Sequence, residues 1–485
     1  MRNQIALLKC TLLVVLYAVT GAVALAQAPA KPVSTIPAEL NKHLEKLGIP
    51  LDSVSLSVQK LGAEESLVNV HSSVPRNPAS VMKMLTTYAA LAKLGPGYQW
   101  ETELRRTGLA EGGVLRGDLI IVGRGNPMFL QQDLWSMVNH LDARGIRSIA
   151  GDLIIDSSYF DLPDHDSSAF DGKGYRPYNA GPDAALFNFS SVDFSLVPQK
   201  GKEFVDVRVA PHIRGMEIES TIKQLNGDCR GNRIKLRLDV EQLEASRKVK
   251  YSGHYPRSCG RYQLTRAVLP STELLYGTLS SIMASRGGEL TGGLLIGRAP
   301  KGSSKLLTLS SKTLSEIVRS TNKFSNNVMS RQLFLTLGAE TYGKPATPGK
   351  GENALKAVLS EEGVDTDSLI VANGSGLCRQ CRVTVDTLMQ TLDAAWQSIY
   401  MPEFVASLGV PGIDGSLKKR FPKGSYKGRV HMKTGTIDHV SAAAGYVQSK
   451  SNERYKFALV INHENVHKGK GNAFQRKLMS WIVNQ

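Results

Sequence analysis

A serine and a lysine three residues apart open an apolar helix in the stretch NPASVMKMLTTYAAL, residues 77–91. Positions three apart share one face of a helix, so the Lys83 ammonium can reach the Ser80 Oγ. A lysine on an apolar face loses solvation, which disfavours its charged form and lowers its pKa. The neutral amine could then take the serine proton and make the hydroxyl a nucleophile. The competing interpretation is a helix-capping serine beside a lysine that extends to solvent.

The Ser-x-x-Lys spacing occurs five times in the chain, beginning at Ser57, Ser80, Ser220, Ser320 and Ser416. In the alternating strand pattern around Ser57, the serine and its lysine would point to opposite faces. Ser220 lies in a β-rich region, and Ser416 lies in a basic loop that contains glycine. Ser80 alone begins a strongly apolar helix, so its context favours this pair as the reactive one.

Two further short motifs could complete a serine-based site. Ser325 and Asn327, in KFSNNVMSRQLF, place a hydroxyl and an amide two residues apart at a turn or helix start. Lys433, Thr434 and Gly435 form the only Lys-[Ser/Thr]-Gly sequence of the chain, in a strand pattern whose glycine lets a substrate backbone approach. Each motif alone is more simply a helix cap or a plain strand. Their joint occurrence, in this order and in suitable elements, favours acyl-transfer chemistry.

The elements that would position these motifs form a mixed fold. A helix at residues 36–47 and a hairpin pattern precede the Ser80 helix. Short strands separated by Gly, Asp and Asn turns then run to about residue 269, and two GDLII units, at 117–121 and 151–155, bracket a helical stretch. Helices return afterwards, and the chain closes with a β-meander pattern and an amphipathic helix. The apolar face of that last helix indicates core packing better than membrane attachment.

We therefore expect an α/β (α+β) protein with two interleaved parts. A helix-and-sheet domain of residues 27–97 and 270–485 would carry the motifs. A β-rich insertion of residues 98–269 would interrupt it, and its length is that of a domain.

The first 26 residues predict a secretory signal. Arg2 and Lys9 precede or interrupt the apolar run LLVVLYAVTGAVAL, and Ala24-Leu25-Ala26 forms a small-x-small cleavage site. Cleavage would give a periplasmic protein with no stable membrane anchor. The alternative is an uncleaved membrane anchor.

Charge and cysteine content add two expectations. The formal net charge of +16 is scattered, as in RKVK, LKKR and KGKG, without a nucleic-acid-binding pattern. The charge suits an anionic extracellular polymer or a membrane surface, or it serves solubility alone.

Cys10 leaves with the signal, and the four remaining cysteines in an oxidising compartment suggest disulfides. Three pairings are open, and proximity favours Cys229–Cys259 with Cys378–Cys381. A redox role for CRQC lacks a βαβ context, and a zinc site lacks the spacing.

The motif trio resembles the penicillin-binding protein and serine β-lactamase superfamily. More narrowly, the chain is similar to the D-alanyl-D-alanine carboxypeptidase/endopeptidase family, the class C low-molecular-mass penicillin-binding proteins of the penicillin-binding protein 4 type. Four features carry this likeness over the mature chain. They are the long gap between Ser80 and Ser325, the pair GDLIIVGRGNP and GDLIIDSSYFD, the sequence NGSGL at 373–377, and HMKTGTIDHVSAAAGYV. The resemblance implies a β-lactamase/transpeptidase-like catalytic domain, with an antiparallel sheet flanked by helices.

The resemblance also implies roles for the residues of the first two motifs. Ser80 would attack the carbonyl of a D-Ala-D-X peptide bond while Lys83 takes its proton. Ser325 would relay a proton to the leaving amine, and Asn327 would hydrogen-bond Lys83 and the substrate amide. Water would then hydrolyse the acyl-enzyme, with no metal or cofactor. β-Lactams, which mimic the substrate, would acylate Ser80 and leave slowly.

The third motif would bind substrate. Lys433 would supply positive potential that lowers the pKa of Lys83 further, and Thr434 would bind the terminal carboxylate. Gly435 would let the substrate approach, and the backbone N–H groups of Ser80 and Thr436 would form the oxyanion hole. The implied substrates are the stem peptides and crosslinks of peptidoglycan, without a choice between carboxypeptidase and endopeptidase.

One departure from the family pattern, one candidate contact and two alternative functions qualify this expectation. The family usually has Asp-Gly-Ser-Gly-Leu-Ser-Arg where this chain has NGSGLCRQC, which puts the substrate preference in doubt. Asp156 could contact a cationic diamino acid of a stem peptide, although a turn-forming role fits its DSSYFD context better. The alternatives are a serine β-lactamase in the same fold and a non-catalytic cell-wall-binding protein. A β-lactamase would need a positioned base for deacylation, and the sequence names none.

Overall fold

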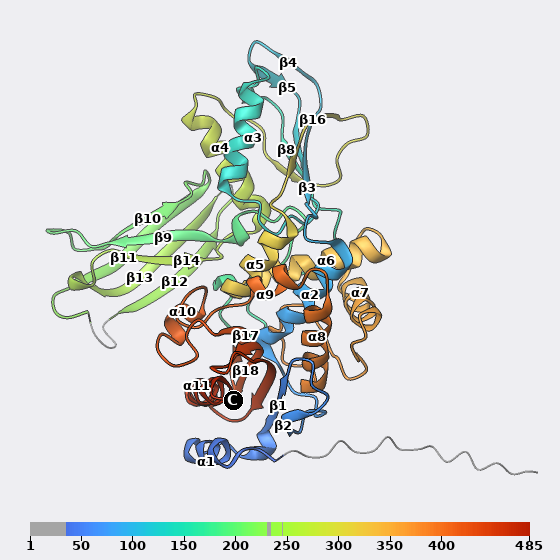
Figure 1. Cartoon of the computed structure of the whole chain (residues 1–485). Coiled ribbons are helices and arrows are strands. Elements are labelled where there is room, and N and C mark those ends of the chain that lie inside the picture. The colour runs from blue at the N-terminus through green and yellow to red at the C-terminus, as the bar shows by residue number, and fades with distance from the viewer. Residues whose placement is uncertain (1–34, 230–233, 245) are drawn as a thin grey trace, which may run out of the picture. The chain divides into compact units, whose positions relative to one another are not determined.

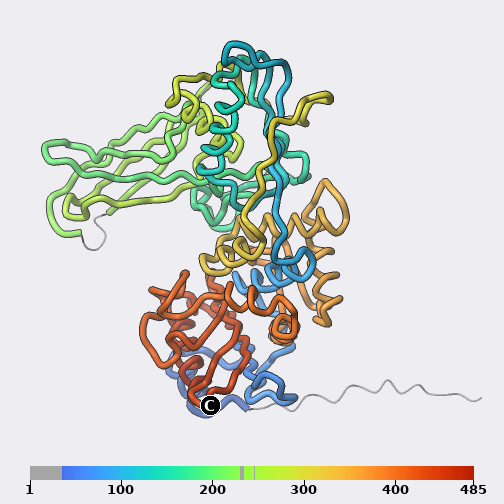
Figure 2. The backbone as a smooth tube through the Cα atoms, turned by 45° about the horizontal axis from the view of Figure 1, so that its top comes forward, coloured from blue at the N-terminus to red at the C-terminus, as the bar shows by residue number. Residues whose placement is uncertain are grey.

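The computed structural model describes residues 35–229, 234–244 and 246–485. A five-stranded antiparallel sheet of order β17-β18-β19-β1-β2 joins an early and a late part of this chain. Figure 2 shows the early segment running beside the C-terminal one. The strands are β1 (Val54–Lys60), β2 (Ser66–Val70), β17 (Val430–Ile437), β18 (Val440–Gln448) and β19 (Arg454–Asn462).

Alternate residues of this sheet enter two different cores, because successive side chains of a strand point to opposite faces. Ala443 and Val447 of β18 pack with α1 (Ala38–Leu47) and α11 (Lys470–Val483). Ala442 and Ala444 face a larger core built from helices. Those helices are α2 (Met82–Leu94), α5 (Leu314–Phe324), α6 (Asn327–Tyr342), α7 (Pro348–Glu361), α8 (Val385–Gln397) and α9 (Met401–Ser407). The predicted antiparallel sheet flanked by helices is confirmed (Figure 1).

The chain leaves this part after α2 and builds a second five-stranded sheet of order β15-β8-β6-β3-β16. Its strands are β3 (Glu101–Arg106), β6 (Leu119–Val122), β8 (Leu153–Asp156), β15 (Leu294–Ile296) and β16 (Ser304–Ser310). The two GDLII units supply β6 and β8, which pair in parallel with α3 (Gln131–Asp142) between them in sequence. This strand–helix–strand arrangement is the one that the repeat predicts.

Three small sheets and one helix complete the middle of the chain. They comprise β4 (Leu109–Glu111), β5 (Val114–Arg116) and β7 (Ser148–Ile149); β9 (Val192–Val197), β10 (Asp206–Ala210) and β14 (Tyr262–Arg266); β11 (Met216–Leu225), β12 (Lys235–Gln242) and β13 (Arg247–Pro256); and α4 (Ser271–Ser285). β15 and β16 follow residue 269, yet they pair with β8 and β3. We therefore propose that the insertion extends to about residue 310 instead of 269. Helical periodicity at 271–285 could not reveal this, because it does not say which sheet a helix covers.

The cysteine and terminal-helix predictions are confirmed. Cys229 is bonded to Cys259, and Cys378 to Cys381. α11 buries Phe474, Leu478 and Ile482 in the core.

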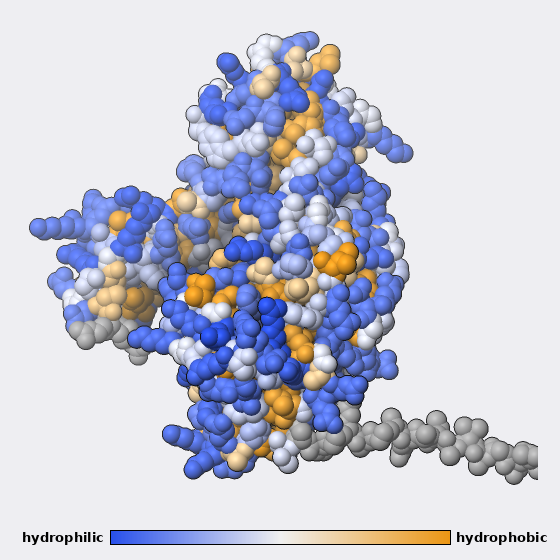
Figure 3. Space-filling view, in the orientation of Figure 1, coloured by the Kyte–Doolittle hydropathy of each residue, from blue (hydrophilic) through white to orange (hydrophobic). Residues whose placement is uncertain are grey.

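The signal-peptide prediction for residues 1–26 lies outside the described residues. Among the described residues, no helix combines the length and apolar character that a membrane crossing needs. Hydrophilic residues predominate on the face shown in Figure 3, where hydrophobic residues form separate patches.

Candidate active site

The turn that carries Ser80 is held in place by the side chain of Asn77. Asn77 accepts a hydrogen bond from the Ala79 backbone N–H at 2.9 Å, and its side chain donates to the Cys378 carbonyl at 2.8 Å. Ala79 has the left-handed φ of 46°, which few residues other than glycine adopt. A short 3₁₀ turn, Ala79–Val81, then precedes α2. Ser80 consequently projects at the mouth of the apolar helix that the sequence predicts.

Lys83 lies beneath Ser80 and is fully buried, with 0% of its surface exposed. Its Nζ is 2.9 Å from the Ser80 Oγ, 2.6 Å from the Asn327 Oδ1 and 2.6 Å from the Ser375 carbonyl oxygen. Burial lowers the pKa of Lys83 well below its usual value, and the cations Lys433 and Arg331 lower it further. A neutral amine has two N–H donors and one lone pair. The two carbonyl oxygens take the donors, which leaves the lone pair for the Ser80 hydroxyl proton.

Ser325 and Asn327 reach the same place because the chain breaks between two helices. Ser325 adopts the left-handed φ of 56° at the end of α5. The next residue, Asn326, caps α6 by accepting from the Met329 N–H. The break turns the Ser325 hydroxyl toward Lys433, whose Nζ lies 2.9 Å away. Asn327 is therefore the first residue of α6, and its Oδ1 faces Lys83 while its amide donates to the Tyr178 carbonyl at 2.9 Å.

The third motif lies on β17, directly against the Ser80 turn. Lys433 is 2% exposed, and burial together with the Arg420 guanidinium lowers the pKa of Lys433 to about 7. Gly435 permits the contact: a Cβ at this position would lie 2.3 Å from the Pro78 carbonyl oxygen and 2.9 Å from the Ser80 N. The structure thus brings together six predicted residues from three separate segments: Ser80, Lys83, Ser325, Asn327, Lys433 and Gly435.

The NGSGL sequence has a function that motif spacing did not reveal. Its Ser375 carbonyl accepts the hydrogen bond from Lys83. Gly376, with a φ of 74°, fits so closely that a Cβ would lie 1.8 Å from the Ala79 carbonyl oxygen. The Cys378–Cys381 disulfide closes the adjoining loop. This loop therefore fixes the lysine end of the Ser-x-x-Lys pair.

Arg420 is a second residue that the sequence did not single out. It ends α10 (Leu417–Arg420), and its guanidinium donates to the Thr434 Oγ1 at 3.1 Å and the Thr436 Oγ1 at 3.2 Å. Its Nε donates to the Asn472 Oδ1 at 2.8 Å. Both threonine oxygens act as acceptors, so their hydroxyl protons are free to point into the site. The basic stretch LKKR was the only sequence feature that pointed to Arg420, and it could not be told apart from the other scattered positive charge of the chain.

Asp156 is not part of this group. It is 7% exposed at the end of β8, and its carboxylate accepts backbone N–H bonds from Ser158 at 2.9 Å and Ala299 at 2.8 Å. It lines a separate cavity to which none of the motif residues contributes. The turn-forming alternative fits this environment, because both carboxylate oxygens already have partners. Within the described segments, no cluster of three or more His, Cys, Asp or Glu side chains could hold a metal ion.

Fold and site together define a class of serine acyl-transfer enzymes: an antiparallel sheet flanked by helices, with Ser-x-x-Lys, Ser-x-Asn and Lys-Thr-Gly motifs gathered around one serine. A family model for the D-Ala-D-Ala carboxypeptidase 3 (S13) family matches residues 36–484. The chain belongs to this family of serine peptidases, which confirms the resemblance, the fold class and the enzyme class that the sequence predicts.

Similar proteins match over most of this chain and most of their own length. A D-alanyl-D-alanine carboxypeptidase of Actinomadura sp. (strain R39) is 29% identical over 399 residues, which is 79% of this chain and 73% of that protein. DacB of Haemophilus influenzae is 24% identical over 413 residues, which is 84% of this chain and 85% of that protein. The crystal structure of penicillin-binding protein 4 (dacB) from Haemophilus influenzae superimposes with a TM-score of 0.76 at 22% identity. That superposition covers 93% of this chain and 100% of the other.

A first prediction concerns the close approach at Gly435. We expect Gly435→Ala to slow acylation by a fluorescent penicillin about 100-fold, because a displacement of about 1 Å between reacting groups has an effect of that size. Gly97→Ala is the matched control, since a Cβ at Gly97 meets nothing within 4 Å. The measurement is the rate of covalent labelling, with the melting temperature of both variants. Equal labelling rates for the two variants would contradict the packing account.

Proposed function

We propose that this protein is a penicillin-sensitive, serine-type D-Ala-D-Ala carboxypeptidase, D,D-endopeptidase, or both, that acts on peptidoglycan through a Ser80 acyl-enzyme. The observation that carries the proposal is the buried Lys83 Nζ, 2.9 Å from the Ser80 Oγ. The names of the similar proteins support it. They include D-alanyl-D-alanine carboxypeptidases and a predatory endopeptidase from Bdellovibrio bacteriovorus.

Acylation begins with the neutral Lys83 amine. Its lone pair accepts the Ser80 proton while the Oγ attacks the carbonyl carbon of the penultimate D-alanine. The backbone N–H groups of Ser80 and Thr436 are the proposed donors to the developing oxyanion. The contact between β17 and the 3₁₀ turn places these two segments side by side.

Collapse of the tetrahedral intermediate expels an amine, which needs a proton. The Ser325 hydroxyl, bonded to Lys433, is the proposed relay: it gives its proton to the amine and receives in exchange the proton that Lys83 took from Ser80. Asn327 orients Lys83 through its Oδ1, and the amide hydrogen that does not bond the Tyr178 carbonyl is the proposed donor to the substrate. Water then attacks the acyl carbon while the neutral Lys83 amine accepts its proton and passes it to the departing Ser80 Oγ, which releases the peptide acid and regenerates Ser80.

The carboxylate next to the scissile bond would bind at Thr434 and Thr436. Arg420 adds positive charge behind both hydroxyls, and Lys433, whose pKa is lowered to about 7, adds more when it is protonated. A bound carboxylate would raise the pKa of Lys433 again, because an opposite charge favours the protonated lysine. Substrate binding would therefore help to charge the lysine that faces Ser325.

We expect Arg420→Ala to lower kcat/KM for an N-acylated D-Ala-D-Ala peptide about 10- to 100-fold, the value of a hydrogen-bonded charge. The same peptide with a C-terminal amide should lose much less. Lys419→Ala removes an equal charge from an exposed neighbour and is the control. An equal loss on acid and amide substrates would show that Arg420 supports the fold and not carboxylate recognition.

The two alternative functions fit the site less well. A β-lactamase needs a base for rapid deacylation. In the described part of the chain, the side chains hydrogen-bonded to Ser80, Lys83 and Ser325 include no carboxylate. A non-catalytic wall-binding protein would not need the complete hydrogen-bonded set of serines, lysines and asparagine.

Location and partners follow from the same proposal. A signal at residues 1–26 would deliver the enzyme to the periplasm, where peptidoglycan is the substrate and β-lactams are covalent inhibitors. Incubation with purified muropeptides followed by mass spectrometry tests the function. Loss of one alanine indicates a carboxypeptidase, and splitting of crosslinked dimers indicates an endopeptidase. Unchanged muropeptides would contradict both activities.

A further inference from the structure

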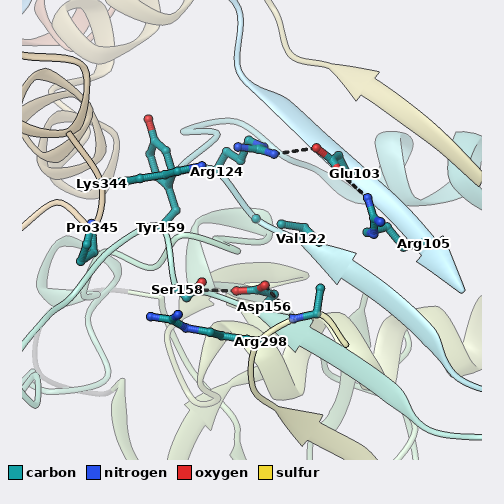
Figure 4. A pocket seen from close by; sticks show the side chains of 12 residues that line it. Glu103, Arg105, Val122, Arg124, Asp156, Ser158, Tyr159, Arg298, Lys344 and Pro345 are labelled. Atoms are coloured by element: carbon teal, nitrogen blue, oxygen red, sulfur yellow. Dashed lines mark hydrogen bonds and ion pairs between the residues drawn. The ribbon is translucent and has the colours of Figure 1, made fainter. Parts of the chain in front are cut away.

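The second sheet opens at one edge onto a cavity of about 430 Å³ that is separate from the Ser80 site (Figure 4). Three strands that run parallel to one another, β6, β8 and β15, end at this edge. Arg124 follows β6, Ser158 and Tyr159 follow β8, and Arg298 follows β15. Ligands of parallel sheets bind outside the carboxyl ends of the strands, where successive loops converge. The sequences GDLIIVGRGNP and GDLIIDSSYFD, which the proposed catalysis does not use, thus meet at one site.

The loop that carries Arg124 is packed against its surroundings. A Cβ at Gly123 would lie 2.4 Å from the Ala184 carbonyl oxygen. Gly125 has a φ of 81°, and its Cβ would lie 2.5 Å from the Phe160 ring. The Gly123 N–H also donates to the Asp156 carbonyl at 2.9 Å. Arg124 is therefore presented from a backbone that other elements hold in place.

Positive charge exceeds negative charge in this cavity, because its lining includes four cationic side chains and two carboxylates. Glu103 is engaged by Arg105 at 3.0 Å and by Arg124 at 2.6 Å. The other carboxylate, Asp156, takes two backbone N–H bonds. Neither carboxylate is hydrogen-bonded to the two remaining cations.

Those cations are Arg298 and Lys344, which come from different parts of the fold. Figure 4 shows Arg298 beneath Ser158, and Lys344 beside Arg124 and Tyr159. Both side chains are exposed, and over the residues that the structure describes neither makes an ion pair or a hydrogen bond. Arg298 acts on Asp156 through its charge alone, which helps to lower the pKa of that carboxyl. The Nε of Arg124 is also buried without a hydrogen-bond partner. A buried donor without an acceptor is costly, so an anionic ligand would satisfy it and the two cations together.

Lys344 also relates the cavity to the active site. α6 begins at Asn327, beside Lys83, and ends at Tyr342, two residues before Lys344. Sixteen residues of α-helix span about 24 Å. A small peptide at Ser80 would not reach the cavity, whereas a polymer could occupy both places.

We propose that this cavity is a second substrate-binding site, which holds carboxylate groups of a peptidoglycan strand whose other stem peptide is at Ser80. The inference rests on the proposed function for the identity of the polymer. Arginine and lysine bind carboxylates through charge-assisted hydrogen bonds, and arginine binds both oxygens at once. The second site would raise the efficiency on polymeric substrate without taking part in bond cleavage.

The test compares two substrates with one pair of matched variants. Arg298→Glu/Lys344→Glu reverses the two unpaired cations, and Lys301→Glu/Lys450→Glu makes the same change in net charge at exposed positions outside the cavity. We expect the first variant to cleave insoluble peptidoglycan about 10-fold more slowly. It should cleave a soluble N-acylated D-Ala-D-Ala tripeptide at the rate of the unmodified protein. The control should match the unmodified protein on both substrates. Unchanged cleavage of the polymer, or equal losses on both substrates, would overturn the proposal.

A second experiment, which measures binding instead of cleavage, separates this inference from the proposed function. Ser80→Ala protein should sediment with insoluble peptidoglycan, and the cavity reversal in that background should reduce the bound fraction, whether or not the enzyme cleaves the polymer. Peptidoglycan whose carboxyl groups have been converted to amides should bind as weakly as the reversed variant. Full binding to the amidated polymer would show that another anion, such as a phosphate, is the ligand, and would contradict the carboxylate assignment. Failure of the unmodified enzyme to cleave either substrate, with binding intact, would contradict the proposed function alone.

Discussion

Ser80→Ala protein is expected to form no covalent adduct with a fluorescent penicillin. The variant removes the only atom that can become acylated in the proposed mechanism, the Ser80 Oγ. Removal of a catalytic serine in other enzymes reduces turnover by about 10⁴-fold or more, so hydrolysis of a D-Ala-D-Ala peptide should fall to the same extent. The Lys83 amine would remain in place, since it keeps its bonds to Asn327 and to the Ser375 carbonyl.

The control for this experiment is another serine of the same spacing. Ser416 begins a Ser-x-x-Lys sequence on an exposed loop, and its backbone N–H donates to the Lys323 carbonyl. Ser416→Ala should label like the unmodified protein. Labelling of Ser80→Ala at the control rate would place the nucleophile elsewhere in the chain.

Lys83→Ala should lower the acylation rate about 10²- to 10⁴-fold while the protein stays folded. The serine then has no base, and water is a poor substitute in a buried site. Asn327 and the Ser375 carbonyl also lose their partner, so the melting temperature must be measured beside the rate. A folded variant that acylates as fast as the unmodified protein would rule out the base role.

The pH dependence of the acylation rate tests whether Lys83 acts as a neutral amine. Burial and neighbouring cations lower the pKa of Lys83, so the neutral amine exists down to a pH well below the usual lysine range. Acylation should fall only when the pH drops through this lowered pKa, because the amine then becomes protonated. Lys83→Arg should not restore the rate, since a guanidinium stays charged. A rate that rises only above pH 10 would indicate a lysine with an ordinary pKa.

The sequence predicted the residues that meet at the candidate site because each lies in a short motif whose chemistry is local. Ser80 and Lys83 are one helical turn apart, and Lys433 and Gly435 share one strand. The family resemblance predicts that the three motifs lie together, and in the structure hydrogen bonds join them: Lys83 to Asn327, and Lys433 to Ser325.

Other partners could not be predicted, because they depend on tertiary packing. The Ser375 carbonyl is 292 positions from Lys83 in the sequence, and a backbone carbonyl leaves no residue-type signal. Arg420 resembles its exposed neighbours in LKKR until the fold places it behind Thr434. We propose a longer insertion than the sequence predicts for a related reason: the partners of β15 and β16, the strands β8 and β3, lie far earlier in the chain.

The most direct measurement is peptide mapping of the enzyme after brief exposure to a D-Ala-D-Ala substrate and rapid acid quenching. The account predicts one acyl adduct, on the peptide that contains Ser80, together with release of free D-alanine. The claim that the buried Lys83 makes Ser80 the nucleophile would be contradicted by either of two results. One is release of D-alanine with an adduct on a different residue, and the other is release by an enzyme that never carries an adduct.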